Sequence, residues 1–461
     1  MSYEEKYNKF VEEGIQLFKD RDFKGAKNKF ESALLLSTLN PTIYQNIAVT
    51  GIEMGDIKEA INNLLKLVEK TPENIQAVVK LGDLYLQITD YKNALKYYEL
   101  GLKLNPAQPM VLLNLAILKS SDDPNIAIEY LKKSLKMDPN NFLTHFNLAN
   151  HYQRTHKEDK CLKHYRKTIK LNPNFYPAYG RYHETLIQTC NWSEAKKIEK
   201  LLDRMNRESI NKGVEPPESP LSHISRTHDP DANYLLTRAW GYSIERSITN
   251  IFKKREHIIP RTKPEKLKIG YLSSDFRNHA IGHLMFGLFS KHDRNKFEIY
   301  AFSTSPDDKS WYYKFIKDHA DRFVDLVGVS ADDAATIIKD LGIHILVDIN
   351  GHTSGDRLTT LALKPAPIQV NYLGYPGSTG TTFMDYIIAD PIIIPEDQRK
   401  YYSEAVAYLP NCYQVNSAQP VSTKKFDRKK LGLPENAFVF ASFNQPIKIE
   451  PGTFAAWTRM L

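Results

Sequence analysis

Two histidines stand four residues apart in the stretch NHAIGHLM, residues 278–285, directly after an expected β-strand. This spacing places the rings of His279 and His283 on one face of a helix expected at about residues 281–290. Imidazole can ligate a metal, transfer a proton or form a hydrogen bond with a charged substrate. The rest of the sequence distinguishes among these chemistries.

The sequence lacks residues that several common kinds of site require. A zinc helix of the HExxH type needs glutamate directly after its first histidine, whereas Ala280 follows His279. No third ligand has an obvious spacing, although Asp348 or His352 could converge on the pair. No GxGxxG follows the first expected strand and no GxSxG elbow occurs, which disfavours hydride transfer and serine hydrolysis. We therefore expect no metal and no cofactor.

Group transfer from an activated nucleotide donor is compatible with the same residues. Such an enzyme has to stabilise a departing diphosphate and position an acceptor hydroxyl. Backbone amides at helix N-termini, a lysine and a histidine can do this without a metal. A histidine near the start of the helix would point into a cleft between domains, where it could donate to phosphate or help to position the acceptor.

The residues after Lys266 alternate short apolar runs with helical stretches, which indicates a parallel sheet covered on both faces. Besides the helix at 281–290, helices are expected at about 309–320 and 332–341. Strands are expected at 266–273, 297–304, 322–327, 343–349, 368–374, 385–390 and 405–409.

Polar segments follow these strands and read SSDFRNHAIGHLM, STSPDDKS, NGHTSGDR and LGYPGSTG. Ligands of parallel sheets bind at the carboxyl ends of strands, and loop amides and hydroxyls suit a polar ligand. We expect Asp307 and Asp308 in the second segment to cap a turn or a helix rather than to bind a metal.

The first two hundred residues repeat with a period of 33 or 34. Large apolar or aromatic residues follow most of the small residues of this repeat after four positions, and prolines 72, 106, 139 and 173 close successive units. The pattern resembles tetratricopeptide repeats, whose helical hairpins bury their apolar stripes by stacking on one another. The small residues are Ala26, Ala60, Ala94, Ala127, Cys161 and Ala195.

The change of pattern predicts four parts of the chain. We expect an α-helical array of about six tetratricopeptide repeats at 1–205 and a linker with a helix at 206–265. An α/β Rossmann-like lobe at 266–424 follows, and the start of a second lobe at 425–461 ends the sequence.

Arrays of this kind bind extended peptides in a concave groove. Asn46, Asn114 and Asn147 occupy the same place in their repeats, and a ladder of asparagines can clamp the backbone amides of a peptide. The alternative is that they are ordinary solvated helix positions, since three repeats carry other residues there. We expect protein or peptide partners for the array.

Composition excludes several classes of protein. The formal charge of +8 is spread along the chain without a long Lys/Arg run, which disfavours nucleic acid but suits an anionic small substrate such as a nucleotide diphosphate. Three distant cysteines argue against a disulfide framework. The N-terminal stretch has no apolar signal core and no segment reaches transmembrane length, so we expect no membrane association and a cytoplasmic, or nucleocytoplasmic, protein.

The long motifs carry a specific resemblance. KIGYLSSDFRNHAIGHLM, GIHILVDINGHTSGDR, KPAPIQVNYLGYPGSTG and FNQPIKIEP stand in the order and spacing of the O-GlcNAc transferase family, behind the same kind of repeat array. The resemblance covers nearly the whole chain and is closest to the compact bacterial-type members. It implies a GT-B glycosyltransferase that is inverting, needs no metal, and transfers N-acetylglucosamine from UDP-GlcNAc to Ser or Thr of proteins.

The resemblance also implies roles for single residues. His279 and His283 match the histidines of the family's first active-site loop, and we rank His279 first as the cleft histidine, with His283 equally compatible with a structural role. Gln445 matches a donor-binding position, and Lys448 would contact the donor diphosphate, where it offsets the charge on leaving UDP. Leu373, Gly374 and Pro376 match the loop near the donor sugar.

One departure from the family is the end of the sequence at Leu461, which we expect to lie about one strand and a turn into the second GT-B lobe, so that this lobe is only begun. We expect a fragment or a degenerate product that does not turn over alone. Ile447 also replaces a common aromatic, which leaves other donors open: GDP-fucose to Ser or Thr, or UDP-glucose to Asn. A non-catalytic tetratricopeptide scaffold with a vestigial transferase region is the remaining alternative.

Overall fold

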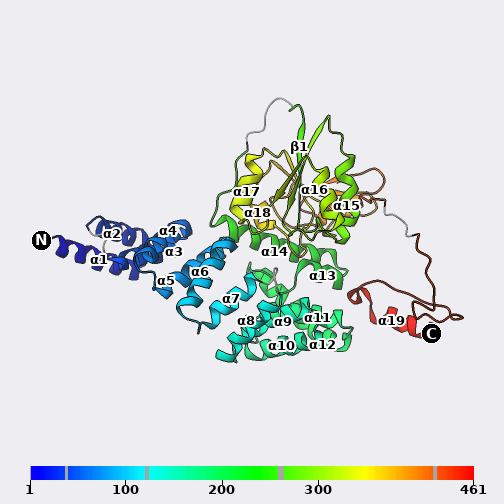
Figure 1. The fold of residues 1–461 in the computed structure, drawn as a ribbon, viewed down its shortest axis with the longest axis horizontal. Helices are drawn as coiled ribbons and strands as arrows, with labels where there is room; N and C mark the ends of the chain where they lie inside the picture. The colour runs from blue at the N-terminus through cyan, green and yellow to red at the C-terminus, as the bar shows by residue number, and fades with distance from the viewer. Residues whose placement is uncertain (1, 37–39, 120–123, 258–263, 419–422) are drawn as a thin grey trace.

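The computed structural model describes residues 2–36, 40–119, 124–257, 264–418 and 423–461. Figure 1 shows an array of helical hairpins, coloured blue to cyan, with an α/β lobe standing above its second half. The helices of the array are α1 (Tyr3–Lys19), α2 (Phe23–Leu36), α3 (Pro41–Met54), α4 (Ile57–Lys70), α5 (Ile75–Gln87), α6 (Tyr91–Leu104), α7 (Pro109–Leu118), α8 (Pro124–Met137), α9 (Phe142–Arg154), α10 (Glu158–Leu171), α11 (Pro177–Gln188) and α12 (Trp192–Asn211).

Successive helix pairs form the six expected repeats among the described residues. All six small residues of the repeat are at most 1% exposed, which confirms that they lie where helices cross closely. In the third repeat a Cβ on Gly82 would lie 2.6 Å from the ring of Tyr98, so only glycine admits that ring. The four prolines follow the ends of α4, α6, α8 and α10, as expected, because proline cannot continue a helix. The short turn of the fourth repeat, residues 120–123, lies outside the described residues.

The segment expected as a linker with a helix contains that helix and is packed against its neighbours. Helix α12 continues to Asn211, beyond the expected boundary, and α13 (Pro220–Arg226) and α14 (Pro230–Thr249) follow. Glu218 is 1% exposed and accepts hydrogen bonds from Arg226 Nε at 2.9 Å and Nη2 at 2.8 Å. This charge pairing allows a Pro-rich, polar stretch to be buried between the array and the lobe.

The lobe contains one parallel sheet, whose strand order is β3-β2-β1-β4-β5-β6-β7. All seven strands match the expected ones, and all neighbouring strands are parallel. The Rossmann-like α/β prediction is therefore confirmed. The strands are β1 (Leu267–Ser273), β2 (Phe297–Ser303), β3 (Arg322–Asp325), β4 (Ile345–Asp348), β5 (Ile368–Asn371), β6 (Tyr386–Ala389) and β7 (Ala405–Tyr408).

Helices cover both faces of the sheet because its strands are apolar on both sides. Tyr271 of β1 packs into a core with Phe289 of α15, whereas its neighbour Leu272 packs into a second core with Ile338 of α17. The helices of the lobe are α15 (Ala280–Lys291), α16 (Trp311–His319), α17 (Ala331–Asp340), the short α18 (Leu358–Ala362) and the 3-10 helix η1 (Glu396–Tyr401), of which the last two were not expected.

The lobe is attached to the array at two places. Near the first repeats, Lys58 Nζ lies 3.3 Å from Asp332 Oδ2 at the start of α17, and the Ala331 amide donates to Thr89 Oγ1 at 2.8 Å. At the other end, α14 lies between array and sheet (Figure 1), and a Cβ on Gly241 would lie 2.7 Å from Gly380 O. These contacts hold the edge of the sheet that lies lower in Figure 1 next to the array.

The last described segment differs from its expectation. Residues 423–461 contain the 3-10 helix η2 (Pro446–Lys448) and α19 (Pro451–Met460), but the expected first strand of a second lobe is not formed there. A strand requires a hydrogen-bonding neighbour, and the described residues offer none to this segment. Phe443 is fully exposed, while Phe454 lies 5.7 Å from Trp192 of α12, ring centroid to centroid.

Two observations on the described residues bear on the composition. No described helix has the length and apolar character needed to cross a membrane. The three cysteines are all free, and Cys161 is buried in the array where the repeat requires a small side chain.

Candidate active site

The strand order reverses between β1 and β4. In open parallel sheets, ligands bind outside the carboxyl ends of the strands at such a reversal, because the connections diverge to opposite faces there. The loops that follow β1 and β4 therefore define the candidate site. Ser274, Asp275, Asn350 and His352 follow these two strands, and each is 9% exposed or less.

Asn350 joins the two loops. Its Nδ2 donates to Ser274 Oγ and to Asp275 Oδ2, each at 2.9 Å, and its Oδ1 accepts from the Ser274 amide at 3.0 Å. The Asp275 amide donates in turn to Ser273 Oγ at 3.0 Å. Both sides of the carboxamide are thus used, and the buried polar atoms have the partners that they require.

His279 stands at the edge of this network. Its backbone is extended, with φ −144° and ψ 155°, and it forms the N-cap of α15. Its Nδ1 lies 3.3 Å from the Ile281 amide and 3.5 Å from Asp275 Oδ1. The side chain is 42% exposed, so the ring reaches from a buried carboxylate into solvent.

His283 occupies a different environment. Its Nε2 lies 2.8 Å from Asn278 Oδ1, and its ring stacks on Tyr312 of α16 at 4.1 Å between centroids. The expectation that both histidines share one helix face is wrong, because His279 caps the helix and only His283 lies within it. The structure thus separates His279, which pairs with Asp275, from His283, which packs against α16.

The acidic pair of the second loop takes part in turns, as expected. Asp307 Oδ1 accepts from the Lys309 amide at 2.7 Å, and Asp308 Oδ1 accepts from the Ser310 amide at 3.0 Å. Asp308 Oδ2 also accepts from the Asn278 amide at 2.8 Å. The second loop therefore supports the first one from outside the site.

Burial perturbs two further groups at the end of β4. Asp348 is 1% exposed, and desolvation raises its pKa to about 7 although the amides of Asn350 and Gly351 donate to it. Burial also lowers the pKa of His352 to about 4. His352 Nε2 lies 2.7 Å from the Thr379 carbonyl, so this nitrogen carries the proton and donates.

These positions also bear on metal binding. His352 does not join His279 and His283, because its ring is committed to Thr379 inside the lobe. Within the described ranges, no three His, Cys, Asp or Glu side chains are grouped closely enough to hold a metal ion. The independence of the site from a metal stays a prediction.

The LGYPG loop after β5 approaches the same edge of the sheet. A Cβ on Gly374 would lie 1.9 Å from the Ile349 carbonyl, so only glycine fits against the end of β4. Leu373 has a φ of 75° and packs into the core beneath α15, whereas Pro376 is exposed. The loop thus lies next to the Asn350 network, and its role in donor binding stays a prediction.

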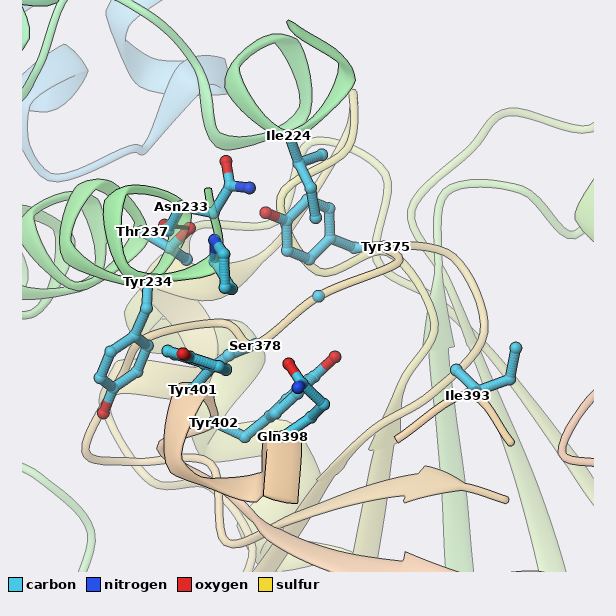
Figure 2. Close-up of a pocket in the computed structure, with 12 residues that line it drawn as sticks. Ile224, Asn233, Tyr234, Thr237, Tyr375, Ser378, Ile393, Gln398, Tyr401 and Tyr402 are labelled. Carbon is cyan, nitrogen blue, oxygen red and sulfur yellow. Dashed lines mark hydrogen bonds between the residues drawn. The ribbon is translucent and has the colours of Figure 1, made fainter. Parts of the chain in front are cut away.

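A cavity of about 140 Å³ is lined in part by Tyr375 and Gly377 of this loop (Figure 2). Its lining combines the rings of Tyr234, Tyr375, Tyr401 and Tyr402 with uncharged polar groups. The polar groups are already occupied: Asn233 Oδ1 lies 2.6 Å from His223 Nδ1, for example. Because the cavity presents no charge and few unsatisfied polar atoms, it is a poor match for a nucleotide diphosphate.

Gln445 and Lys448 lie elsewhere in this structure. Both are exposed at η2, which contacts α11 of the array. Their neighbours Ile447 and Ile449 line a groove with His183 of that helix. The structure does not bring Gln445 and Lys448 to His279, and their donor-binding role stays a prediction.

The three asparagines of the array are half-buried and do not share one environment. Asn114 Nδ2 donates to Tyr98 Oη at 2.9 Å, and Asn147 Nδ2 donates to the Leu143 carbonyl of its own helix at 2.9 Å. The amide donors of Asn114 and Asn147 are therefore engaged within the array, unlike that of Asn46 among the described residues.

The sequence did not single out Asp275 or Asn350. Each lies within a polar segment after a strand, but many polar loop residues do so. Asp275 and Asn350 differ from the other polar loop residues in their position, because they follow β1 and β4, the two strands that flank the reversal of strand order. That adjacency depends on the sheet order.

Comparisons with known proteins agree with this architecture. A probable UDP-N-acetylglucosamine–peptide N-acetylglucosaminyltransferase of Arabidopsis thaliana, SEC, is 34% identical over 294 residues, 60% of this chain and 30% of that protein. A Caenorhabditis elegans protein named UDP-N-acetylglucosamine–peptide N-acetylglucosaminyltransferase is 41% identical over 152 residues, 33% of this chain and 13% of that protein. The chain thus spans less than a third of the length of either relative.

The structure of a Thermobaculum terrenum O-GlcNAc transferase mutant superposes with a TM-score of 0.50 and 21% identity, over 84% of this chain and 66% of that one. This likeness supports the fold. Residues 41–74, 75–108 and 116–141 match the tetratricopeptide repeat. Residues 190–427, more than half of the chain, match Glycosyl transferase family 41, and the chain therefore belongs to that family.

Proposed function

We propose that this chain acts in the transfer of N-acetylglucosamine from UDP-GlcNAc to Ser and Thr hydroxyls of proteins, by an inverting reaction that needs no metal. The observation that carries the proposal is the polar network at the reversal of strand order in a lobe of glycosyl transferase family 41. It presents His279 to solvent beside a buried carboxylate. The names of the Arabidopsis and C. elegans relatives support UDP-GlcNAc as donor.

In this proposal the array recruits the acceptor protein. Its attachment near Asp332 and at α14 directs the repeats to the same edge of the sheet as His279. An acceptor held along the repeats would therefore meet the site without a long linker. Asn46, whose amide is not engaged by the described residues, is the best placed of the three asparagines to contact a peptide. We also propose a cytoplasmic location, which suits the three free cysteines.

The first experiment compares four ligands by thermal stabilisation of the full chain: UDP, UDP-GlcNAc, UDP-glucose and GDP-fucose. A ligand at about one hundred times its Kd adds about 2.7 kcal/mol to the free energy of unfolding. We expect shifts with UDP and UDP-GlcNAc and none with GDP-fucose. A shift with GDP-fucose alone would refute UDP-GlcNAc as the donor.

A second candidate function is a peptide-binding scaffold without catalysis. The position of Gln445 and Lys448 on the array, away from His279, favours it. Under this alternative none of the four nucleotides stabilises the chain, whereas an acceptor protein still binds the array. Asn46→Ala should then weaken that binding, and Asn147→Ala, whose amide is already bonded to its own helix, serves as the control.

A further inference from the structure

The imidazole of His279 faces two competing partners through one atom. Nδ1 lies 3.3 Å from the Ile281 N–H, which requires an acceptor, and 3.5 Å from Asp275 Oδ1, which requires a donor. One nitrogen cannot serve both at once. If Nδ1 keeps its lone pair it caps α15, and the proton resides on Nε2. If Nδ1 carries the proton it pairs with the carboxylate, and neutral Nε2 has a free lone pair.

Asp275 is held in place for this contact. Its other oxygen, Oδ2, accepts from Asn350 Nδ2 at 2.9 Å, and the residue is only 5% exposed. Arg277 Nη2 approaches the same Oδ1 at 3.4 Å, but that side chain is 45% exposed, so water competes for its guanidinium. The carboxylate therefore faces His279 from a fixed and buried position.

We propose that Asp275 is a positioning residue that selects the Nδ1–H form of His279 and so presents Nε2 as a hydrogen-bond acceptor on the solvent side. The described residues give Nε2 no hydrogen-bond partner. In this form Nε2 receives a hydrogen bond from a neutral hydroxyl, the acceptor group of the proposed transfer. In the opposite form, favoured by the Ile281 amide, Nε2–H donates to an anionic oxygen such as a phosphate.

This assignment rests on the proposed function only in naming the groups that bind to Nε2 of His279. The choice of tautomer is a property of the free protein, since Asp275, Asn350 and Ile281 all belong to the chain. The measurement is therefore made on the free protein, without a nucleotide sugar. Failure of the tautomer assignment and failure of the proposed function can be told apart.

The experiment measures the ring nitrogens of His279 by long-range proton–nitrogen NMR of the full chain labelled in its histidines. The His279→Gln variant identifies the signal. We expect the Nδ1–H form to dominate the neutral ring, and Asp275→Asn to move the ratio of the two forms at least about tenfold towards Nε2–H. This figure is the usual difference between hydrogen bonds to charged and to neutral groups.

Asp308→Asn is the matched control, because this carboxylate contacts the Asn278 amide of the same loop and not the imidazole. It removes one negative charge at a similar place and should leave the ratio unchanged. The signals of His283 and His352 report whether the lobe stays folded in each variant. If Asp275→Asn unfolds the loop, Asp275→Glu, which keeps the charge but displaces the carboxylate from Nδ1, should move the ratio in the same direction by a smaller factor. An unchanged ratio in folded Asp275→Asn, or an equal change in Asp308→Asn, would overturn the proposal.

Discussion

Replacing Asn350 by alanine tests whether one carboxamide holds the candidate site together. The change removes three hydrogen bonds of 2.9 to 3.0 Å, to Ser274 Oγ, to Asp275 Oδ2 and from the Ser274 amide. Neutral hydrogen bonds contribute about 0.5–1.5 kcal/mol each and bonds to a charged group about 1.5–3 kcal/mol. The expected local cost is therefore about 3–5 kcal/mol, since the stranded atoms are buried.

The cost should be local, because Asn350 lies at the carboxyl edge of the sheet and the partners in these three bonds, Ser274 and Asp275, directly follow β1. Hydrogen exchange of the backbone amides measures it directly, since local opening reports its own free energy. A loss of about 3 kcal/mol accelerates exchange roughly a hundredfold, at about 1.4 kcal/mol for each factor of ten. We expect this at Ser274 and in the loop up to His279, and no change in α9 to α12.

Asn371→Ala is the matched control at the end of the neighbouring strand β5. Asn371 is also fully buried, but its amide makes a single hydrogen bond of 3.1 Å, to the Gly377 carbonyl. Its loss should cost about 1 kcal/mol and affect the LGYPG loop instead. Less than tenfold faster exchange at Ser274 in Asn350→Ala, or an equal effect of both variants there, would refute the reasoning.

Two further predictions concern docking and pH. Gly241→Ala should separate α14 from the lobe, because its Cβ would lie 2.7 Å from the Gly380 carbonyl. We expect a loss of about 1–3 kcal/mol in thermal unfolding, whereas Gly452→Ala, with nothing within 4 Å, should change nothing, and equal effects would disprove the contact. Burial lowers the pKa of His352 to about 4, so the unfolded chain binds this proton first as the pH falls. The contribution of His352 to stability is complete above about pH 6.5 and should fall by about 3 kcal/mol towards pH 4. Urea midpoints should show a smaller loss over this window for His352→Gln, and an identical loss would contradict the assignment.

Much of the architecture follows from local sequence patterns. The 33–34-residue period placed every hairpin of the array, because a small residue such as Ala94 is required wherever two helices cross closely. The seven strands were also predicted, since a strand buried on both faces reads as an apolar run whatever its neighbours are. The order of the polar segments placed the candidate site at the carboxyl edge of the sheet.

Other features depended on partners that the sequence does not name. Residues 206–265 were expected to form a linker with a helix, and the burial of Glu218 in this segment depends on its pairing with Arg226. The first strand expected in residues 425–461 is not formed, because β-structure exists only with a hydrogen-bonded neighbour.

In the candidate site, too, local sequence patterns determined some features and tertiary contacts determined others. The sequence by itself determined that His279 begins a helix at a strand end, because strand and helix patterns are local. Only the tertiary structure decided that His279 caps that helix, that Asp275 faces its ring and that Asn350 fixes Asp275. The contact between Asn350 and Asp275 joins residues 75 positions apart, and it exists because β1 and β4 are neighbours in the sheet, a pairing set by the packing of the whole lobe.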